Sequence, residues 1–475
     1  MRLTTPAFKD NARGALADPN LQESLGKLRT GFQAIRADAV AGLPDFEALR
    51  DTARDLKDHT LANLDEYLTR YEAKVIELGG HVHWARDAAE ARDIVLELCR
   101  SVGARKVTKG KSMIAEEVGL NEFLEANGIE PIETDLGEYI VQLAKEPPSH
   151  ILAPAVHKTV AQVADLFLEH HGKYGKTRRL EQPPELVAEA RDVLRARYFE
   201  ADVGITGANF LVAENGASVI VTNEGNGDLT QVLPRMHIVL TSIEKVVPSL
   251  DDVSVLLRIL ARSATGQEMS AYTTFSFGPK RADDLDGPDS FHVILLDNGR
   301  AAMLGTEFQD ILRCIRCGAC LNHCPIYGAV GGHAYGWVYS GPMGAVLTPA
   351  LIGITDAAHL PNASTLCGRC ESVCPMRIPL PRMLRDWRRK AFEAKLMPPR
   401  ARAGLAVWAW LAARPALYRA ITGPAMRLLA AMAGRKGRFR ALPLAGGWTG
   451  GRDLPAPQGA TFQAQWAQKQ RTRRR

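Results

Sequence analysis

Apolar segments of strand length alternate with helical patterns between residues 63 and 300. Short strands that alternate with amphipathic helices are typical of an α/β domain built around a sheet. In the first half of this region we expect strands at residues 82–84, 129–132 and 151–153, and helices at residues 87–100 and 184–198.

The second half of this region is richer in strand patterns. A glycine-rich segment at residues 223–228 (NEGNGD) joins two of the expected strands. Glycine permits positive φ and close backbone approach, so this segment could cradle a ligand. It could also be a strand-ending turn, which is the interpretation that we favour. The expected strands lie at residues 210–213, 218–222, 237–240 and 272–277.

Residues 1–62 have a polar, helical pattern, in which Leu21, Leu25, Leu28 and Phe32 follow helical spacing,. We expect a helical N-terminal extension that packs on a partner subunit or on the chain's own body. The N-terminus lacks the apolar core of a signal peptide, so we expect a cytoplasmic protein.

Residues 396–475 form a basic C-terminal region that is rich in Ala and Trp. The apolar segment at residues 403–413 is too short to span a bilayer,. It could lie on a membrane surface, pack into a partner or be a buried helix of this chain, and we favour the partner. The sequence predicts no transmembrane span.

Charge is distributed unevenly along the chain. Residues 381–475 contain 21 Lys and Arg against 3 Asp and Glu, a net charge of +18, whereas the rest of the chain carries −12. A basic tail on an acidic body favours an acidic partner, a membrane surface or nucleic acid, although it could also be a solvated face. No recognised nucleic-acid module accompanies the tail, so we expect no nucleic-acid partner.

Seven of the eight cysteines lie in two short runs. The first run, from Cys314 to Cys324, reads C-x2-C-x2-C-x3-C-P, which is the bacterial ferredoxin pattern for iron–sulfur clusters,. The second run reads C-x2-C-x3-C-P, with Ser364 where a fourth cysteine would complete the pattern. Zinc would also accept CxxC pairs, but two CP endings fit two zinc sites poorly. The eighth cysteine, Cys99, lies in an apolar stretch and is expected to be a buried structural thiol.

In two-cluster ferredoxins the last cysteine of each run ligates the other cluster. Applied to this chain, the crossover predicts two 4Fe–4S clusters, the second of which lacks one cysteine ligand. The predicted ligands are Cys314, Cys317, Cys320 and Cys374 for cluster 1, and Cys324, Cys367 and Cys370 for cluster 2.

The 42 residues between the two runs exceed what a compact ferredoxin uses. Helical patterns flank the runs at residues 307–313 and 380–391. Residues 301–395 are therefore expected to form a mainly helical ferredoxin domain with two iron–sulfur clusters. The complete division places the helical extension at 1–62, the α/β domain at 63–300, the ferredoxin domain at 301–395 and the basic domain at 396–475.

Three segments resemble the lactate utilization protein B family, bacterial iron–sulfur proteins of lactate oxidation. They are CIRCGACLNHCPIYGAVGGHAYGWVYSGPMGAVLTP from Cys314, LCGRCESVCPMRIPL from Leu366 and GITGANFLVAENGASVIVTNEGNGDL from Gly204. The resemblance implies a lactate-utilization α/β domain with a fold similar to sugar isomerases and CoA transferases. It also implies a cytoplasmic complex in which two companion subunits and this electron carrier oxidise L-lactate to pyruvate.

Alternatives to this function stay open at the level of sequence. Glu214, within Ala213-Glu214-Asn215-Gly216, resembles the nucleophilic glutamate of CoA transferases, which would make the chain an enzyme of that class or of the isomerase class with accessory clusters,. A glutamate in a turn is the favoured interpretation, so no catalytic residue is predicted. The chain could also serve another 2-hydroxy acid such as glycolate, and its electron acceptor is not identified.

Overall fold

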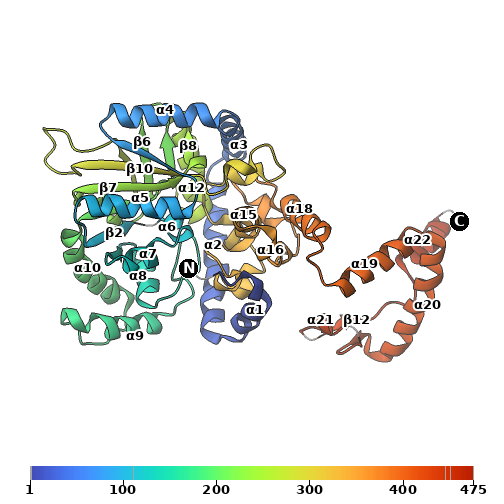
Figure 1. Ribbon diagram of the computed structural model, residues 1–475. Coiled ribbons are helices and arrows are strands. Elements are labelled where there is room, and N and C mark those ends of the chain that lie inside the picture. Colours follow the sequence, from blue (N-terminus) through green and yellow to red (C-terminus); the bar gives the residue numbers. More distant parts are fainter. Residues whose placement is uncertain (1–2, 111, 444, 450, 474–475) are drawn as a thin grey trace. The chain divides into compact units, whose positions relative to one another are not determined.

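The computed structural model describes residues 3–110, 112–443, 445–449 and 451–473, without the side chains of residues 28–30 and 435. The predicted position of the Leu28 side chain therefore lies outside the described residues. The chain divides into two compact units, residues 1–391 and 392–475. The first unit contains the N-terminal helices, the α/β part and a mainly helical segment with both cysteine runs (Figure 1). We call residues 301–391 the cysteine module.

Six parallel strands form the main sheet, in the order β1-β10-β7-β4-β2-β3. Every position of β7 and all but the first of β10 are buried, as expected where helices cover both faces of a parallel sheet,. A separate hydrophobic cluster lies on each face of the sheet. One cluster contains residues of α5 and the other contains residues of α4. The strands are β1 His81–Ala85, β2 Lys106–Gly110, β3 Glu130–Glu133, β4 Val203–Thr206, β7 Met236–Ser242 and β10 Ser290–Leu296.

A second, mixed sheet of four strands has the order β8-β5-β6-β9. In it, β5 pairs parallel to β8 and antiparallel to β6, which in turn pairs antiparallel to β9. Its strands are connected to the main sheet along the chain: β5 and β6 come after β4, and β8 and β9 come after β7. The strands are β5 Phe210–Val212, β6 Ala217–Thr222, β8 Val246–Val247 and β9 Tyr272–Ser276.

Several helices of the α/β part begin at residues whose side chains accept hydrogen bonds from free backbone N–H groups. Asp87 and Asp135 accept such bonds at the starts of α5 and α8, and Thr159 and Ser249 form capping boxes before α9 and α12,. The elements are α4 Leu64–Glu77, α5 Ala88–Ser101, α6 Met113–Glu117, α7 Leu120–Ala126, α8 Leu136–Leu143, α9 Val160–His171, η2 Gly172–Tyr174, α10 Pro183–Glu200, α11 Asn226–Val232, η3 Ile243–Lys245 and α12 Leu250–Ala264.

Most of the predicted elements of this part are confirmed, including β1, β3, β7, α5 and α10. Cys99 is fully buried on α5, as predicted for a structural thiol. The strand prediction at residues 151–153 is wrong. The backbone N–H groups of Leu152 and Ala153 donate to the ring Nδ1 of His150, at 3.1 and 3.2 Å, and Pro154 follows, so this segment does not join a sheet,.

The favoured interpretation of the glycine-rich segment as a strand-ending turn is confirmed, but the segment does not join two strands directly. Residues 223–225 form a turn, but α11 begins at Asn226, so the segment leads into a helix before the next strand. The strands β2, β4 and β10 were not among the predicted elements, although β10 is a continuous apolar run of the kind that lies inside a parallel sheet,.

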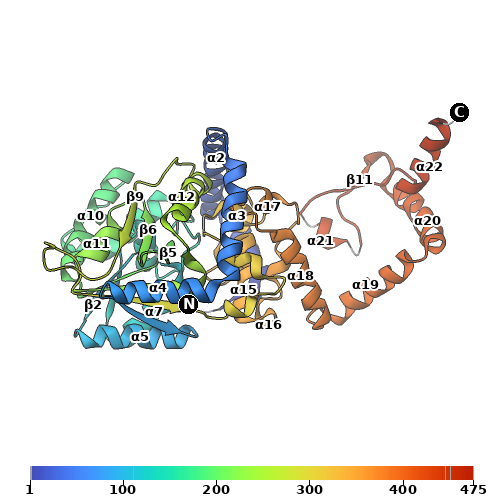
Figure 2. The same ribbon diagram turned by 90° about the horizontal axis from the view of Figure 1, so that it is seen from above.

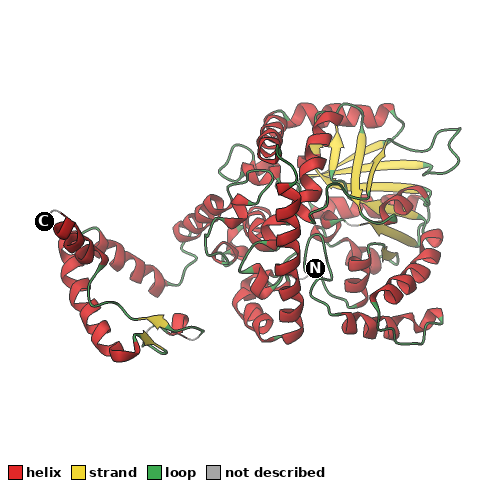
Figure 3. Cartoon of the chain, turned by 180° about the vertical axis from the view of Figure 1, so that it is seen from behind, coloured by secondary structure: helices red, strands yellow, loops and turns green. Residues whose placement is uncertain are grey.

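Three N-terminal helices pack on the chain's own body. Both α2 and α3 contact α12 of the α/β part, and both also contact elements of the cysteine module. Phe46 and Leu49 of α3 belong to the same hydrophobic cluster as Cys324 and Cys374. Figures 2 and 3 show these helices from above and from behind. The elements are η1 Thr5–Ala7, α1 Phe8–Ala17, α2 Pro19–Ala41 and α3 Phe46–Ala62.

The cysteine module consists of short helical turns and two longer helices, α15 and α18. The helix predicted at residues 307–313 is present only as the 3-10 helix η5, while the one predicted at 380–391 is α18. The elements are η4 Ala301–Met303, η5 Gln309–Arg313, α13 Ala319–Asn322, α14 Tyr327–Val330, η6 His333–Tyr335, α15 Gly341–Ile352, α16 Ile354–Ala357, η7 Leu360–Asn362, α17 Arg369–Ser372 and α18 Leu380–Glu393.

The second unit is mainly helical and has little core of its own. Among its described residues only Ala433 and Phe439 are buried. No helix in the described part of the chain is both long and apolar enough to cross a bilayer. The elements are α19 Pro399–Ala412, α20 Pro415–Ala433, η8 Gly434–Lys436, β11 Arg438–Phe439, α21 Gly446–Thr449, β12 Leu454–Pro455 and α22 Phe462–Arg473.

Candidate functional site

The two cysteine runs have the same backbone design. In the first run, Arg316 and Gly318 take positive φ values of 59° and 71°, and the short helix α13 follows. In the second run, Leu366 and Gly368 take φ values of 55° and 84°, and the short helix α17 follows. Positive φ turns the chain back on itself, so that successive cysteine side chains can converge on one point.

Ser364 occupies the position in the second run that Cys314 occupies in the first. The backbone N–H of Arg316 donates to Cys314 Sγ at 3.4 Å. In the same way, the N–H of Leu366 donates to Ser364 Oγ at 3.1 Å. The serine hydroxyl therefore has the local geometry of the missing fourth thiol.

Four of the predicted ligands line one small cavity. Cys314, Cys317 and Cys320 come from the first run, and Cys374 arrives from the end of the second run, 50 residues beyond Cys324. The other walls are apolar, with Ile151, Ile315, Met343 and Ile378 among them. The chain thus brings together the four cysteines that the crossover rule selects for cluster 1.

The remaining three predicted ligands form a second group. The pKa of the Cys370 thiol rises to about 12 because the thiol is buried and because Cys324 and Cys367 lie near it. Cys324 and Cys370 are buried, whereas Cys367 is exposed. The pKa of Cys367 is lowered, mainly by a hydrogen bond from the backbone N–H of Arg369. This second group is therefore more open to solvent than the first.

The donor set fits iron–sulfur clusters. Burial, and then the neighbouring thiols, raise the pKa of Cys317 and Cys320, and burial raises that of Cys374 to about 11. Buried thiols in this state ionise only when a cation binds them, because a metal deprotonates the thiols that ligate it. Grouped buried thiols with backbone N–H groups aimed at sulfur are the environment in which iron–sulfur clusters are bound.

Tyr335 lies beside the second group. Its side chain is fully buried, and its hydroxyl has no hydrogen-bond partner that meets ordinary geometry among the described residues. Burial and then the charge of Cys324 raise the pKa of the phenol. The insertion between the two cysteine runs therefore supplies a polar atom close to Cys324.

Two arginines of the N-terminal helices hold the second cysteine run. Arg50 on α3 donates to the backbone carbonyl oxygens of Ser372 and Cys374, at 3.0 and 2.7 Å for Nη2. Arg36 on α2 donates to the carbonyl oxygen of Val373 at 2.9 Å. Both arginines are buried. Residues 372–374 are therefore fixed by helices that lie more than 300 positions earlier in the sequence.

A buried charged network joins the α/β part to the first cysteine run. Arg300 forms a two-bond ion pair with Glu117, at 2.9 and 2.7 Å, and its Nε lies 2.9 Å from Glu244. Glu244 also lies 3.5 Å from Arg316, whose guanidinium stacks on Tyr339 at 4.6 Å. The arginines lower the pKa of Glu244 to about 2 despite its burial. The network was not predicted from the sequence, because its residues lie far apart in the chain. Each of them appears in the sequence only as a single charged residue beside apolar ones.

A larger cavity of about 460 Å³ opens at the carboxyl ends of strands β2, β3, β4 and β7. Arg316 and Tyr339 of the cysteine module and Lys245 of η3 line it. The turn residues Asn223 and Glu224 of the glycine-rich segment also line it, so this segment does border a cavity. Crevices at the carboxyl ends of parallel strands are the usual ligand sites of α/β sheets.

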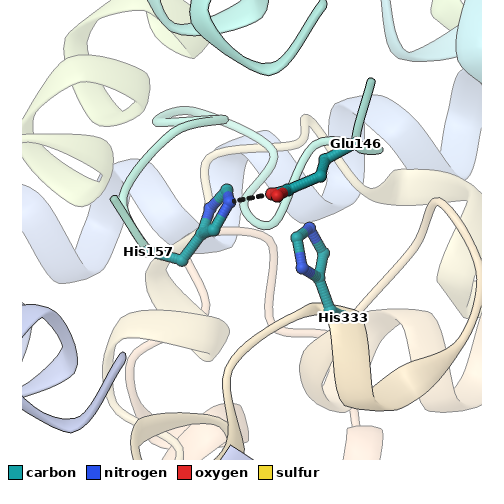
Figure 4. Close-up of side chains that lie close together, drawn as sticks. All are labelled: Glu146, His157 and His333. Carbon is teal, nitrogen blue, oxygen red and sulfur yellow. Dashed lines mark hydrogen bonds and ion pairs between the residues drawn. The ribbon is translucent and has the colours of Figure 1, made fainter. Parts of the chain in front are cut away.

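Glu146, His157 and His333 form a second polar cluster (Figure 4). The ligand atoms that the three side chains offer lie within 4.8 Å of one another, a distance at which they could hold a metal ion. The Glu146 carboxylate already pairs with His157 at 2.8 Å and with Lys158 at 2.6 Å. These contacts, the His157 hydrogen bond first, lower the pKa of Glu146 to about 2. The Lys158 ammonium and the His157 ring each contact one oxygen of the carboxylate, so the contacts of Glu146 are those of an ion-pair network.

Glu214 has a structural role. It is exposed in the turn between β5 and β6, where its carboxylate accepts the backbone N–H of Leu250 at 3.1 Å, at the start of α12. Gly216 in the same turn takes a positive φ of 76°. This geometry favours the turn interpretation over a nucleophile.

Three family matches cover most of the chain. Residues 68–296 match the LUD domain, residues 310–378 the 4Fe-4S dicluster domain, and residues 394–471 the C-terminal domain of lactate utilisation protein B. The middle match supports iron–sulfur clusters in the region that holds both cysteine runs. The α/β part with its parallel sheet is therefore followed by a ferredoxin-like dicluster domain.

The chain is also similar to complete curated proteins. It is 41% identical to lactate utilization protein B of Lysinibacillus sphaericus, over 97% of both chains. It is 43% identical to lactate utilization protein B of Bacillus subtilis, over 84% of this chain and 83% of that one. It is 39% identical to the uncharacterized electron transport protein YkgF of Escherichia coli, over 97% of this chain and 96% of that one.

Among solved structures, the chain matches a DUF162 family protein of Deinococcus radiodurans at 12% identity. The match covers 49% of this chain and 98% of that one with a TM-score of 0.27, which is too low to carry an argument about the fold. The family assignment rests instead on the curated relatives, whose similarity extends through the α/β part, both cysteine runs and the basic end. The chain belongs to the lactate utilization protein B family.

Proposed function

We propose that this chain is the iron–sulfur electron-transfer subunit of a complex that oxidises L-lactate to pyruvate. The observation that carries the proposal is the convergence of Cys314, Cys317, Cys320 and Cys374 on one cavity, with Cys324, Cys367 and Cys370 grouped beside it. The family assignment supports a role in lactate utilisation, and the dicluster match supports the cofactor type.

The proposed ligands are those that the crossover rule selects. Cys314, Cys317, Cys320 and Cys374 would hold cluster 1, and Cys324, Cys367 and Cys370 would hold cluster 2. Oxidation of lactate to pyruvate releases two electrons and two protons, and 4Fe–4S clusters exchange electrons one at a time. The role of this chain is to hold both clusters close together, so that two electrons can pass in succession to an electron acceptor that is not identified.

Several features of the chain support this role. Arg316 lies inside the first cysteine run with its side chain largely buried, and a nearby positive charge raises a cluster's reduction potential,. Arg369 in the second run is exposed, so its effect is expected to be smaller. We further propose that the α/β part has the sugar isomerase/CoA transferase-like fold, in keeping with its parallel sheet and LUD domain match.

Companion subunits would supply the chemistry on lactate. The second unit offers them a surface, since Trp408, Trp410 and Leu428 are 59%, 52% and 63% exposed amid many basic residues. Such exposed aromatic and aliphatic groups are typical of protein contact sites, and the positive charge favours an acidic partner. We place the complex in the cytoplasm, where thiols stay reduced.

Anaerobic purification of the complex tests the proposal. Two 4Fe–4S clusters per chain should give about eight iron and eight sulfide. Dithionite should produce EPR signals of reduced clusters, and L-lactate should reproduce at least one of them in the complete complex. Stoichiometric zinc without acid-labile sulfide would refute the cluster assignment. Reduction by glycolate but not by L-lactate would instead favour a different 2-hydroxy acid.

A CoA-transferase activity is the second candidate. It requires Glu214 to form a thioester, yet this carboxylate accepts the backbone N–H of Leu250. Incubation with an acyl-CoA followed by mass spectrometry of the intact chain distinguishes the two functions. A CoA adduct that disappears in Glu214→Gln would favour the transferase.

A further inference from the structure

The 460 Å³ cavity lies where an α/β sheet usually binds its ligand,. Residues that lie one to three positions beyond the ends of four neighbouring parallel strands contribute to its lining. They are Ser112 after β2, Asp135 after β3, Gly207 after β4 and Lys245 after β7. Its volume is in the range of small-molecule pockets, about 300–1,000 Å³.

Lys245 is the most unusual residue of this lining. It is only 8% exposed, and its ammonium has no hydrogen bond or ion pair with any residue that the structure describes. Burial, and next the charge of Arg316, lower the pKa of Lys245 to about 8. A buried cation without a partner is costly to the fold. Its position on a cavity wall therefore points to an anionic ligand.

Arg316 supplies a second positive charge to the same cavity. Its guanidinium lies 3.5 Å from Glu244 and is also held by Met343 Sδ at 3.0 Å and by stacking on Tyr339. Arg316 also belongs to the first cysteine run, and its backbone N–H reaches Cys314 Sγ. An anion bound between Lys245 and Arg316 would thus lie close to the cluster 1 ligands.

The remaining walls indicate which chemical groups the rest of the ligand would carry. Much of the lining is aliphatic, including Ile114, Ile140, Leu152 and Leu260. Ile151 lines both this cavity and the small cavity of the four cysteines, so a single side chain borders both spaces.

Two carboxylates also belong to the lining. Asp135 already accepts the backbone N–H groups of Gly137 and Glu138 at the start of α8, and Glu224 is exposed at the turn. Neither carboxylate forms an ion pair with Lys245 in the described structure. The lining therefore combines two cations with one buried carboxylate, that of Asp135, whose Oδ1 is engaged at the start of α8.

We propose that this cavity binds a short aliphatic acid of the 2-hydroxy or 2-oxo class, with the carboxylate between Lys245 and Arg316. The proposal rests on the proposed function for the choice of acid, since lactate and pyruvate belong to this class. It goes further by placing an acid-binding site in the electron-carrying chain itself, next to cluster 1. Only binding is proposed here.

Lys245→Met separates a ligand-binding role from a structural one. Methionine keeps the length of the side chain and removes a charge that has no partner in the described structure. A lysine kept for a ligand destabilises the empty protein, so the substitution should raise the melting temperature of the ligand-free, cluster-loaded protein. A lysine kept for the fold would give a lower melting temperature.

The test uses the anaerobically purified, cluster-loaded full chain and isothermal titration calorimetry with L-lactate and with pyruvate. Lys245→Met should weaken the binding of the acid at least about tenfold, as expected for the loss of one charge-assisted hydrogen bond. Lys245→Arg should retain most of it. Lys280→Met is the matched control, because Lys280 is exposed, pairs with Asp289 and is absent from the lining. It should bind as the unmodified chain does.

Equal affinity of Lys245→Met and the unmodified chain for both acids would overturn the proposal, as would the absence of binding to the unmodified chain. Neither result would affect the proposed electron-transfer function, which is tested by iron, sulfide and EPR measurements. Conversely, zinc-loaded protein that binds lactate through Lys245 would uphold the site and refute the clusters.

Discussion

The two groups of cysteines share a backbone design but differ in enclosure. Both runs turn through residues with positive φ into a one-turn helix. The first group has four cysteines around a small apolar cavity. The second has three, and one of them, Cys367, is exposed. The same local fold therefore provides one site whose four cysteines are all at least partly buried and one site with an exposed cysteine, and the difference lies in ligand number and exposure.

The same cysteine motif can therefore hold two clusters that differ in their exposure to solvent. A cluster with four cysteine ligands and less exposure keeps its iron more firmly, whereas a more exposed cluster can approach a partner and is more easily oxidised.

Cys374→Ser should remove cluster 1 although its neighbours in sequence belong to cluster 2. The reason is that Cys374 lines the cavity of Cys314, Cys317 and Cys320. Iron content should fall from about eight to about four per chain, and one of the two EPR signals should vanish. Cys370→Ser is the matched control and should remove the other signal. Loss of the same signal in both variants would contradict the assignment of Cys374 and Cys370 to different clusters.

Brief exposure to air should damage cluster 2 first. Its predicted cysteine ligands number three, and Cys367 is accessible to solvent, so the iron that lacks a thiolate leaves readily on oxidation. EPR should then detect an oxidised three-iron cluster. The signal should be absent in Cys367→Ser and present in Cys314→Ser. Decay of both clusters at one rate, without a three-iron species, would contradict the contrast.

Arg50→Gln should destabilise the chain and loosen cluster 1 more than cluster 2. The substitution removes the guanidinium that donates to the carbonyl oxygens of Ser372 and Cys374, the second of which is buried, and this costs about 1–3 kcal/mol of unfolding free energy. Chemical denaturation of the cluster-loaded protein measures this loss, and EPR compares the two signals.

Arg54→Gln is the control for this effect. Arg54 lies on the same helix, but its described contacts are to Asp51 and Asp55 on the surface. Exposed ion pairs contribute less than about 1 kcal/mol. An equal effect of both substitutions would mean that α3 acts through its general stability and not through the carbonyl contacts.

Ser364→Cys should slow the loss of the fourth iron from cluster 2. Ser364 Oγ accepts the N–H of Leu366 as Cys314 Sγ accepts that of Arg316, so a cysteine there would complete the second set. The rate at which the three-iron EPR signal grows in air measures the effect. Ser364→Ala tests the hydroxyl itself: faster loss assigns it as a ligand, while an unchanged rate turns attention to Tyr335, whose hydroxyl lies near Cys324.

Local patterns in the sequence predicted a large part of the fold. The spacing within each run, for example that of Cys317 and Cys320, is a local signal, because one turn of backbone sets which thiols converge. Strands such as β1 and β7 were predictable for the same reason, since their apolar residues identify them without knowledge of their partners.

Features that depend on distant partners could not be predicted. Residues 151–153 look like a strand, but the ring of His150 binds two of the backbone N–H groups. In the sequence alone, Lys245 and Arg300 look like ordinary charged residues next to apolar strands. Only the fold reveals that Arg300 pairs with Glu117, and that Lys245 faces a cavity. The division into four domains at residues 62, 300 and 395 stays a prediction.

The contacts of Arg36 and Arg50 with residues 372–374 have a consequence for biosynthesis. The ribosome completes α2 and α3 long before it reaches the second cysteine run. The carbonyl oxygens of residues 372–374, which accept from Arg36 and Arg50, are therefore made only near the end of synthesis. Iron loading is then a late event that follows release of most of the chain. A shortened gene that omits the first 62 codons should therefore yield a protein that iron–sulfur assembly machinery cannot complete.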